Sequence, residues 1–253
     1  MLLVEPERTQ ADLHFSLFGI PVRVHPFFWI AAVLLGMSLR EPTAVLMWMI
    51  AVFIGVLCHE LGHAAVIRAL GWRPWITLYG LGGLASFQPG FGPRSAPTIV
   101  QQIAISAAGP GAGFLLAAAL AGGLALLGKR VEVVLGLPLG VSVAVLDASS
   151  NHYLNLLVNL LLFTTVAYGI LNLLPVFPLD GGQIARQLFL ATGSPSAIAQ
   201  SLMLSLAVAV GICVIGVNQY LRHDGGLFLP ILFGLLAFEN YALLQSQQGS
   251  RPW

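Results

Sequence analysis

The sequence predicts an α-helical protein that crosses a membrane about six times and carries a small β element at the membrane surface. Hydrophobic residues make up 57% of its 253 residues and charged residues only 8%, whereas soluble proteins carry about 25% charged residues. Most of the hydrophobic residues gather in runs near the roughly 20 residues that a spanning helix needs. Short segments of alternating apolar and polar residues, typical of strands, lie outside those runs.

The chain starts with the β element. Residues 13–25 alternate around a break at Gly19 to Pro21, which predicts a hairpin. The first span that follows is short and needs tilting or extension. Residues 71–97 are rich in Gly and Pro, with a strand-like piece over 76–87, so we expect irregular or β structure there.

Residues 131–146 are apolar but interrupted by Gly136, Pro138 and Gly140, which predicts a loop or an interfacial hairpin. Six spans and short loops leave no room for a second large domain, so we expect a single domain over residues 1–253. The predicted spans cover about residues 26–39, 43–69, 98–127, 153–174, 197–217 and 226–245.

The Lys and Arg residues outside these spans indicate the orientation, because their excess usually stays in the cytoplasm. With the N-terminus inside, inner segments hold Arg8, Arg23, Arg68, Arg73, Arg94, Arg186 and Arg251, and outer loops hold Arg40, Lys129, Arg130 and Arg222. This excess favours a multi-pass protein of the cell membrane with a cytoplasmic N-terminus. The net charge of +1 offers no basic surface for nucleic acid, which we do not expect as a partner.

The second predicted span contains the segment His59-Glu60-Leu61-Gly62-His63. Two His residues four apart on a helix project from one face, so they can bind one metal ion. Neutral imidazoles suit Zn²⁺, and a catalytic zinc site takes three protein ligands and leaves a position for water. Glu60, offset by about 100° from His59, is then placed beside that water as the general base. Ionisable side chains within an apolar span are costly, which favours a metal site over a merely packed His pair.

Asp180 is the best candidate for the third ligand. It follows the fourth span, and two crossings separate it from His63, so both residues lie on the same side of the membrane in either orientation. The alternative role for Asp180 is a turn or helix N-cap residue ahead of residues 183–190. His152 and Asp147 fall on the opposite side, and Glu239 within the last span has no assigned role.

The segment before Asp180 is expected to be irregular, because Pro175 and Pro178 lack backbone donors and stop a helix. Irregular backbone at membrane depth survives where it is buried in protein or lines a wet cavity, such as an active-site cleft. Asn172 precedes this segment. Its amide can hydrogen-bond a substrate carbonyl or its oxyanion, or alternatively join two helices.

Three motifs together resemble the site-2 protease family of intramembrane zinc metalloproteases: His59-Glu60-Leu61-Gly62-His63, Gly109-Pro-Gly-Ala-Gly113, and Asn172-x-x-Pro175 followed by Asp180-Gly181. The resemblance implies that His59, His63 and Asp180 bind one zinc ion, that Glu60 activates water, and that Asn172 supports the substrate or transition state. It also implies a zinc site within the membrane thickness, toward the cytoplasm. Some family members carry PDZ or CBS domains, for which these loops and the C-terminal tail are too short, so we expect a minimal core and any regulation from a separate membrane protein.

The expected function is hydrolysis of peptide bonds in or near transmembrane segments of other membrane proteins. A helical substrate must unwind first, because its carbonyl groups are hydrogen-bonded within the helix. Residues 82–87 resemble the edge strand of the family, which pairs with unwound substrate by strand addition; an ordinary Gly-bearing loop is the alternative.

Two other functions remain open from the sequence. A metal-ion transporter or channel also uses intramembrane His and Asp residues, but it needs polar residues spread across the membrane, and here they gather at one depth. A non-catalytic relative that only binds membrane proteins is disfavoured, because every expected catalytic position is present.

Overall fold

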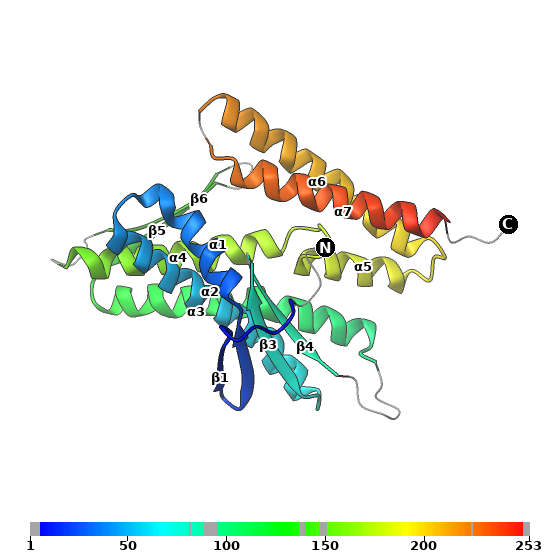
Figure 1. Ribbon diagram of the computed structural model, residues 1–253, viewed down its shortest axis with the longest axis horizontal. Helices are drawn as coiled ribbons and strands as arrows, with labels where there is room; N and C mark the ends of the chain where they lie inside the picture. Colours follow the sequence, from blue (N-terminus) through cyan, green and yellow to red (C-terminus); the bar gives the residue numbers. More distant parts are fainter. Residues whose placement is uncertain are drawn as a thin grey trace. The chain divides into compact units, whose positions relative to one another are not determined.

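A computed structural model describes residues 6–80, 82–88, 96–136, 140–146, 151–223 and 225–249 (Figure 1). The chain forms two compact units. The N-terminal unit comprises Val4–Ala96 and Ala108–Leu171, and the C-terminal unit comprises Pro97–Ala107 and Asn172–Trp253.

A four-stranded sheet in the order β1-β2-β3-β4 belongs to the N-terminal unit. The expected hairpin is confirmed: its two strands are antiparallel, and positive φ angles at Phe18 (52°) and Gly19 (75°) form the tight turn between them. β2 pairs with β3 in parallel, and β3 pairs with β4 antiparallel. The strand-like piece expected over 76–87 is therefore two strands, not one. The strands are β1 (Leu13–Leu17), β2 (Ile20–Val24), β3 (Pro74–Tyr79) and β4 (Gly82–Phe87).

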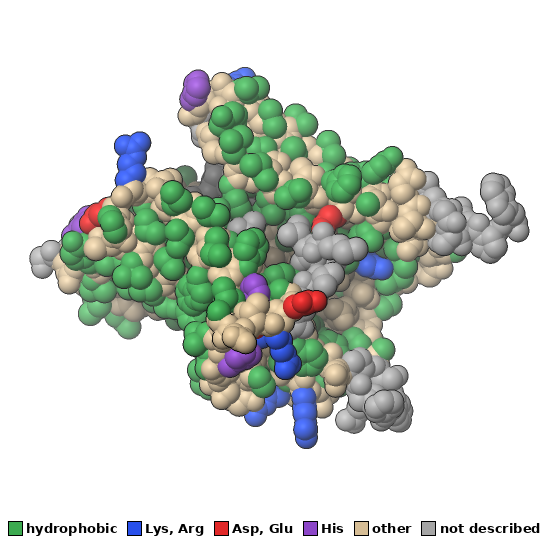
Figure 2. Space-filling model, viewed as in Figure 1, with side chains coloured by type: hydrophobic (Ala, Val, Ile, Leu, Met, Phe, Trp, Pro, Cys, Tyr) green, Lys and Arg blue, Asp and Glu red, His purple; other side chains and the backbone are tan. Residues whose placement is uncertain are grey.

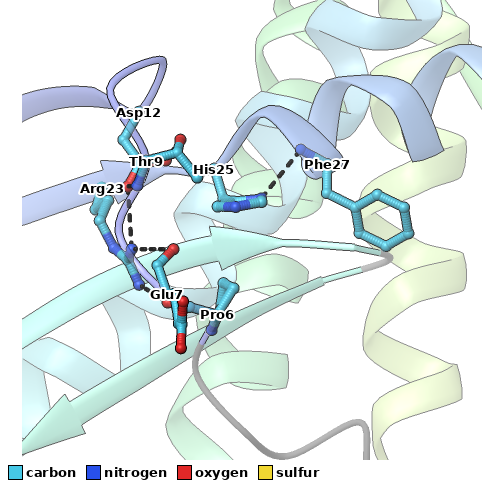
Figure 3. A network of polar contacts seen from close by, with 7 residues as sticks. All are labelled: Pro6, Glu7, Thr9, Asp12, Arg23, His25 and Phe27. Atoms are coloured by element: carbon cyan, nitrogen blue, oxygen red, sulfur yellow. Dashed lines mark hydrogen bonds and ion pairs between the residues drawn. The ribbon is translucent and has the colours of Figure 1, made fainter.

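A buried arginine ties the start of the chain to this sheet (Figure 3). The guanidinium of Arg23 on β2 forms an ion pair with Asp12 at 3.0 Å and donates to the carbonyl oxygen of Pro6 at 2.9 Å. The Thr9 hydroxyl donates to the same aspartate at 2.6 Å. The segment before β1 is thus held by charged and backbone groups, since it has little apolar surface to bury.

Helix α2 packs on the sheet and carries the central part of the core. Val24 of β2, Phe28 of α1 and Ile76 of β3 are buried there together with Val56 and Ala64 of α2. The His25 side chain caps α1 by accepting from the Phe27 backbone N–H at 3.2 Å. Each of these helices begins with proline, which suits the first helical position. The helices are α1 (Pro26–Gly36), followed by a 3₁₀ turn (Met37–Leu39), and α2 (Pro42–Ala69).

Two further helices and a second hairpin follow. Helix α3 (Ile99–Leu126) continues through Pro110, and α4 spans His152–Asn172. Between them, β5 (Arg130–Gly136) and β6 (Gly140–Leu146) form an antiparallel hairpin, one of the two structures expected for this segment. Asn159 of α4 accepts a hydrogen bond from the Val145 backbone N–H at 2.8 Å, which joins the hairpin to the helix.

The C-terminal unit is helical. Helices α6 (Ala197–Leu221) and α7 (Phe228–Gly249) run side by side (Figure 1), and the shorter α5 (Asp180–Ala191) packs against α6. Small residues allow the close approach of α6 and α7: a Cβ at Gly216 would lie 2.9 Å from the Pro230 side chain. Small residues at a helix–helix contact are typical of membrane proteins.

Five helices within the described residues are long and apolar enough to cross a membrane: α2, α3, α4, α6 and α7. The helical membrane fold is thus confirmed, with five long helices where about six spans are expected. Residues 26–39 form the short helix α1 and a 3₁₀ turn, which are too short to count among the five. Hydrophobic side chains cover much of the visible surface of the helices, and several charged and His side chains lie over the four-stranded sheet (Figure 2).

Candidate metal centre

The two His residues of α2 project from one face of the helix and are buried. His59 is 2% exposed and His63 is 7% exposed. Their ring centroids lie 4.8 Å apart at an interplanar angle of 77°. The spacing of four residues therefore places the two imidazoles together, as the sequence predicts.

Helix α3 crosses α2 so closely that glycine is required on both helices. A Cβ at Gly62 would lie 2.3 Å from the carbonyl oxygen of Ala108. On α3, a Cβ at Gly109 would lie 2.2 Å from Nε2 of His63 and 2.6 Å from Nε2 of His59. Both ring nitrogens therefore converge on the small space left by the missing side chain of Gly109.

This convergence fits a metal ion. Zinc binds imidazole nitrogen at about 2.0–2.1 Å, and the ligand nitrogens of the two His residues lie within 4.8 Å of one another. From the sequence, the Gly109 motif contributes only to the family resemblance. The structure gives this glycine a local role, because any larger residue would occupy the space between the imidazoles.

The carboxyl group of Glu60 extends from the same helix toward the start of β4. Glu60 is 3% exposed, and a Cβ at Gly83 would lie 2.5 Å from its Cγ and 2.8 Å from its Cδ. Glycine at this position lets the strand backbone touch the carboxyl group. A buried carboxylate beside two imidazoles is suited to accept and return a proton.

Tyr168 of α4 is a member of this site that the sequence analysis missed. Its ring packs edge-on against His59, with centroids 4.8 Å apart and an interplanar angle of 71°. Its hydroxyl faces β4, where a Cβ at Gly82 would lie 2.7 Å from the oxygen. A tyrosine within an apolar helix gives no signal of its own, because only packing brings α4 to the His pair.

The remaining predicted site residues lie in the C-terminal unit. Asn172 is the last residue of α4 and is 9% exposed. Asp180 is half-buried and is the first residue of α5; the N-cap position belongs to Leu179, which makes no side-chain cap bond. The alternative role of Asp180 as the N-cap is therefore wrong. Its place in the first turn still favours a negative charge, because the backbone N–H groups of a helix start carry partial positive charge.

Two glycines explain how the chain turns at Asp180. A Cβ at Gly181 would lie 2.1 Å from the carbonyl oxygen of Leu173, and a Cβ at Gly182 would lie 2.3 Å from the backbone nitrogen of Phe177. The first turn of α5 is therefore packed directly on the irregular segment that precedes it. Together with Pro175 and Pro178, these glycines leave Asp180 at the start of a tightly folded turn.

The other ionisable candidates are exposed, have local roles or keep no assignment. His25 caps α1, and His14, His152 and His223 are exposed. Asp147 lies outside the described residues. Glu239 is half-buried on α7 and keeps no assigned role.

Comparisons with known proteins identify the family of this chain. The model of peptidase family M50 matches residues 47–215, which include His59, Glu60, His63 and Asp180. A protein of Methanocaldococcus jannaschii named as a zinc metalloprotease is 30% identical over 177 residues, covering 68% of this chain and 43% of that protein. A protein of Synechocystis sp., whose name also contains the words zinc metalloprotease, is 29% identical over 187 residues, covering 68% of this chain and 42% of the relative.

This chain thus spans less than half the length of these curated relatives. The solved structure of a site-2 protease from Methanocaldococcus jannaschii matches with a TM-score of 0.55 and 20% identity, over 96% of each chain. That likeness shows a shared fold.

Proposed function

The chain belongs to peptidase family M50, and we propose that it is an intramembrane zinc metalloprotease that hydrolyses peptide bonds in or near transmembrane segments of other proteins. The observation that carries the proposal is the convergence of the His59 and His63 Nε2 atoms at Gly109, with the Glu60 carboxyl group on the next residue of α2. Two imidazoles can serve as metal ligands and an adjacent buried carboxylate as the general base in metal-assisted hydrolysis.

We assign His59, His63 and Asp180 to one metal-binding group, to which each residue can offer one ligand atom. Two imidazole nitrogens and one carboxylate oxygen are a donor set that suits catalytic zinc, which keeps a further position open. A bound zinc ion would supply the Lewis acidity that activates water and polarises the scissile carbonyl group.

The residues of the chain perform the proton transfers and the positioning. Glu60 takes a proton from the attacking water onto its carboxylate and passes it to the nitrogen of the leaving amine. The Asn172 amide hydrogen-bonds the substrate carbonyl oxygen as negative charge develops on it. Tyr168 packs against the ring of His59 and holds its orientation.

Strand β4 is the element to which we assign the substrate. It is an edge strand of the sheet, paired with β3, and its first residues lie against Glu60 and Tyr168. A substrate segment that has unwound from its helix can add to this edge through backbone hydrogen bonds. Such pairing would place the carbonyl groups of an extended peptide near Glu60.

The five long apolar helices support an integral membrane protein. We propose that it lies in the cell membrane. Its N-terminus and active site then face the cytoplasm, as the excess of Lys and Arg indicates. The partners are then transmembrane substrate proteins, the lipid bilayer and a separate regulatory membrane protein. Reporter fusions at each terminus test the orientation, and a periplasmic or external N-terminus contradicts it.

The first experiment replaces Glu60 with glutamine in the purified full chain. Glu60→Gln keeps the size and one acceptor oxygen but cannot accept the proton, so zinc should stay bound while cleavage of a reporter membrane substrate falls by at least about 100-fold. Full cleavage by Glu60→Gln would remove this residue as the base. Metal flux in liposomes without any peptide-bond cleavage would favour the transporter alternative.

A second experiment tests the third ligand. Asp180→Ala removes the carboxylate and should sharply lower the zinc content of the purified protein. His14→Ala is the control, because this exposed residue lies outside the ligand group. Unchanged zinc stoichiometry in Asp180→Ala would require a different third ligand.

A further inference from the structure

The irregular segment before Asp180 can form few hydrogen bonds between its own backbone groups. Pro175 and Pro178 have no N–H group, so residues 175–179 offer only three backbone donors. The N–H of Val176 donates to the carbonyl oxygen of Leu174 at 2.7 Å, and the N–H of Leu179 donates to that of Val176 at 2.8 Å. The N–H of Phe177 is the third donor, and its partner lies on another helix.

Side chains from α6 and α7 bind both backbone groups of Phe177. Its N–H donates to the Ser205 hydroxyl at 3.0 Å, and its carbonyl oxygen accepts from the Asn240 amide at 2.6 Å. Ser205 is 1% exposed and Asn240 is fully buried. Because unsatisfied backbone groups are costly at membrane depth, these two side chains determine where the segment can lie.

The contacts of Asn240 show that its amide is oriented for this purpose. Its NH₂ group donates to two carbonyl oxygens, those of Phe177 and of Leu236 (2.8 Å), so the assignment of nitrogen and oxygen is unambiguous. Its buried Oδ1 has no hydrogen-bond partner among the described residues. An apolar residue would avoid that cost if packing of α7 were the only role.

Ser205 has a comparable double role. Its hydroxyl donates to the carbonyl oxygen of Ser201 within α6 at 2.9 Å and accepts from Phe177. The ring of Phe177 is held from a third side, by the guanidinium of Arg186 on α5 at 5.2 Å from the ring centroid. Phe177 thus joins α5, α6 and α7 three residues before Asp180.

We propose that Ser205 and Asn240 are positioning residues for Asp180: they fix the backbone of Phe177 on α6 and α7 and thereby set where α5 starts and where the Asp180 carboxylate is held. The inference rests on the proposed function, in which Asp180 is a metal ligand. It extends the site to two helices that supply no ligand, and it makes zinc affinity depend on the packing of α6 against α7.

The test measures the zinc dissociation constant of the purified full chain in detergent by competition with a chelator. Ser205→Ala and Asn240→Leu each remove one contact to Phe177 and should weaken zinc binding by about 10- to 100-fold, the usual effect of losing a group that orients a ligand. Ser201→Ala is the matched control. It lies one turn earlier on α6, is 3% exposed, and its hydroxyl donates to Ile198 of its own helix at 2.8 Å. Zinc affinity of this control should stay within about two-fold of the parent.

A double-substitution experiment separates positioning from a general effect on folding. In an Asp180→Ala background the residual zinc affinity should not fall further when Ser205→Ala or Asn240→Leu is added, because both act through the missing carboxylate. An equal loss in both backgrounds overturns the proposal. If Asn240→Leu does not yield folded protein, the Ser205→Ala cycle alone decides the matter.

The outcomes also distinguish this inference from the proposed function. If the parent chain binds zinc and both Ser205→Ala and Asn240→Leu bind it with the same affinity, the positioning role is overturned and the protease assignment stays intact. A parent chain that binds no zinc, or binds it equally well after Asp180→Ala, overturns both.

Discussion

Replacement of Gly109 by alanine should remove zinc binding while it leaves the fold intact. The added Cβ would lie 2.2 Å from Nε2 of His63 and 2.6 Å from Nε2 of His59, whereas ordinary van der Waals contact begins at 3.4 Å. Each imidazole must therefore retreat by about 1 Å. Zinc sites tolerate deviations of only about 0.2 Å in ligand distance, so neither nitrogen would remain a ligand.

The stability of the protein should change little, for two opposing reasons. The atoms that must move are the ends of two side chains, and a shift of each ring from its preferred rotamer costs about 0.5–1.5 kcal/mol. Alanine is favoured over glycine within a helix by about 1 kcal/mol. We therefore expect a change within about 2 kcal/mol in the free energy of unfolding, together with a loss of zinc affinity of more than about 100-fold.

Gly111→Ala provides the matched control, because this glycine lies two residues further along α3 and a Cβ there would meet nothing within 4 Å. Zinc content per chain, the zinc dissociation constant and the Tm are measured for both variants in detergent. Gly111→Ala should match the parent in zinc binding. A Gly109→Ala protein that still binds one zinc ion per chain with parental affinity would refute the assignment of the two Nε2 atoms as ligands.

Three further predictions follow from individual contacts. Gly83→Ala places a Cβ 2.5 Å from Cγ of Glu60, so cleavage of a reporter substrate should fall at least about 10-fold while zinc content stays normal; parental kcat would contradict this. Tyr168→Phe keeps the ring and should retain zinc, whereas Tyr168→Leu should weaken zinc binding by about 10-fold in a chelator competition; equal affinities would exclude a role for the ring. Hydrogen bonds from Thr9 lower the pKa of Asp12 from 3.8 to about 2. This carboxylate therefore stabilises the folded state above about pH 4 and loses that effect as the pH falls toward 2. Thr9→Ala should raise the pKa of Asp12 toward 3.8 in a carboxyl NMR titration, and an unchanged pKa would contradict the assigned cause.

Local patterns account for the features that could be predicted. The His pair shares a face because helix periodicity brings residues four apart together, whatever surrounds the helix. The turn at Gly19 and the two prolines before Asp180 act through the backbone of their own segment. The same holds for the long apolar helices, whose length and composition determine that they suit a membrane.

Contacts between distant segments could not be predicted in the same way. β2 pairs with β3 although about 50 residues separate them, so a four-stranded sheet replaces the expected hairpin and single strand-like piece. Tyr168 meets His59, and Asn240 meets Phe177, across more than 60 residues in each case. Neither residue belongs to a motif, since a tyrosine or an asparagine in an apolar helix has the same local signal wherever it faces.

The sequence by itself determined the membrane helices, the His-Glu-x-x-His face and the irregular turn before Asp180, because each depends on spacing within one segment. Only the tertiary structure decided which glycines touch the site. Gly83 and Gly109 are required where they are because another element, Glu60 in one case and the two imidazoles in the other, occupies the space of their missing side chains. Close approach between helices or between a helix and a strand is a property of packing, and packing has no period that a single sequence displays.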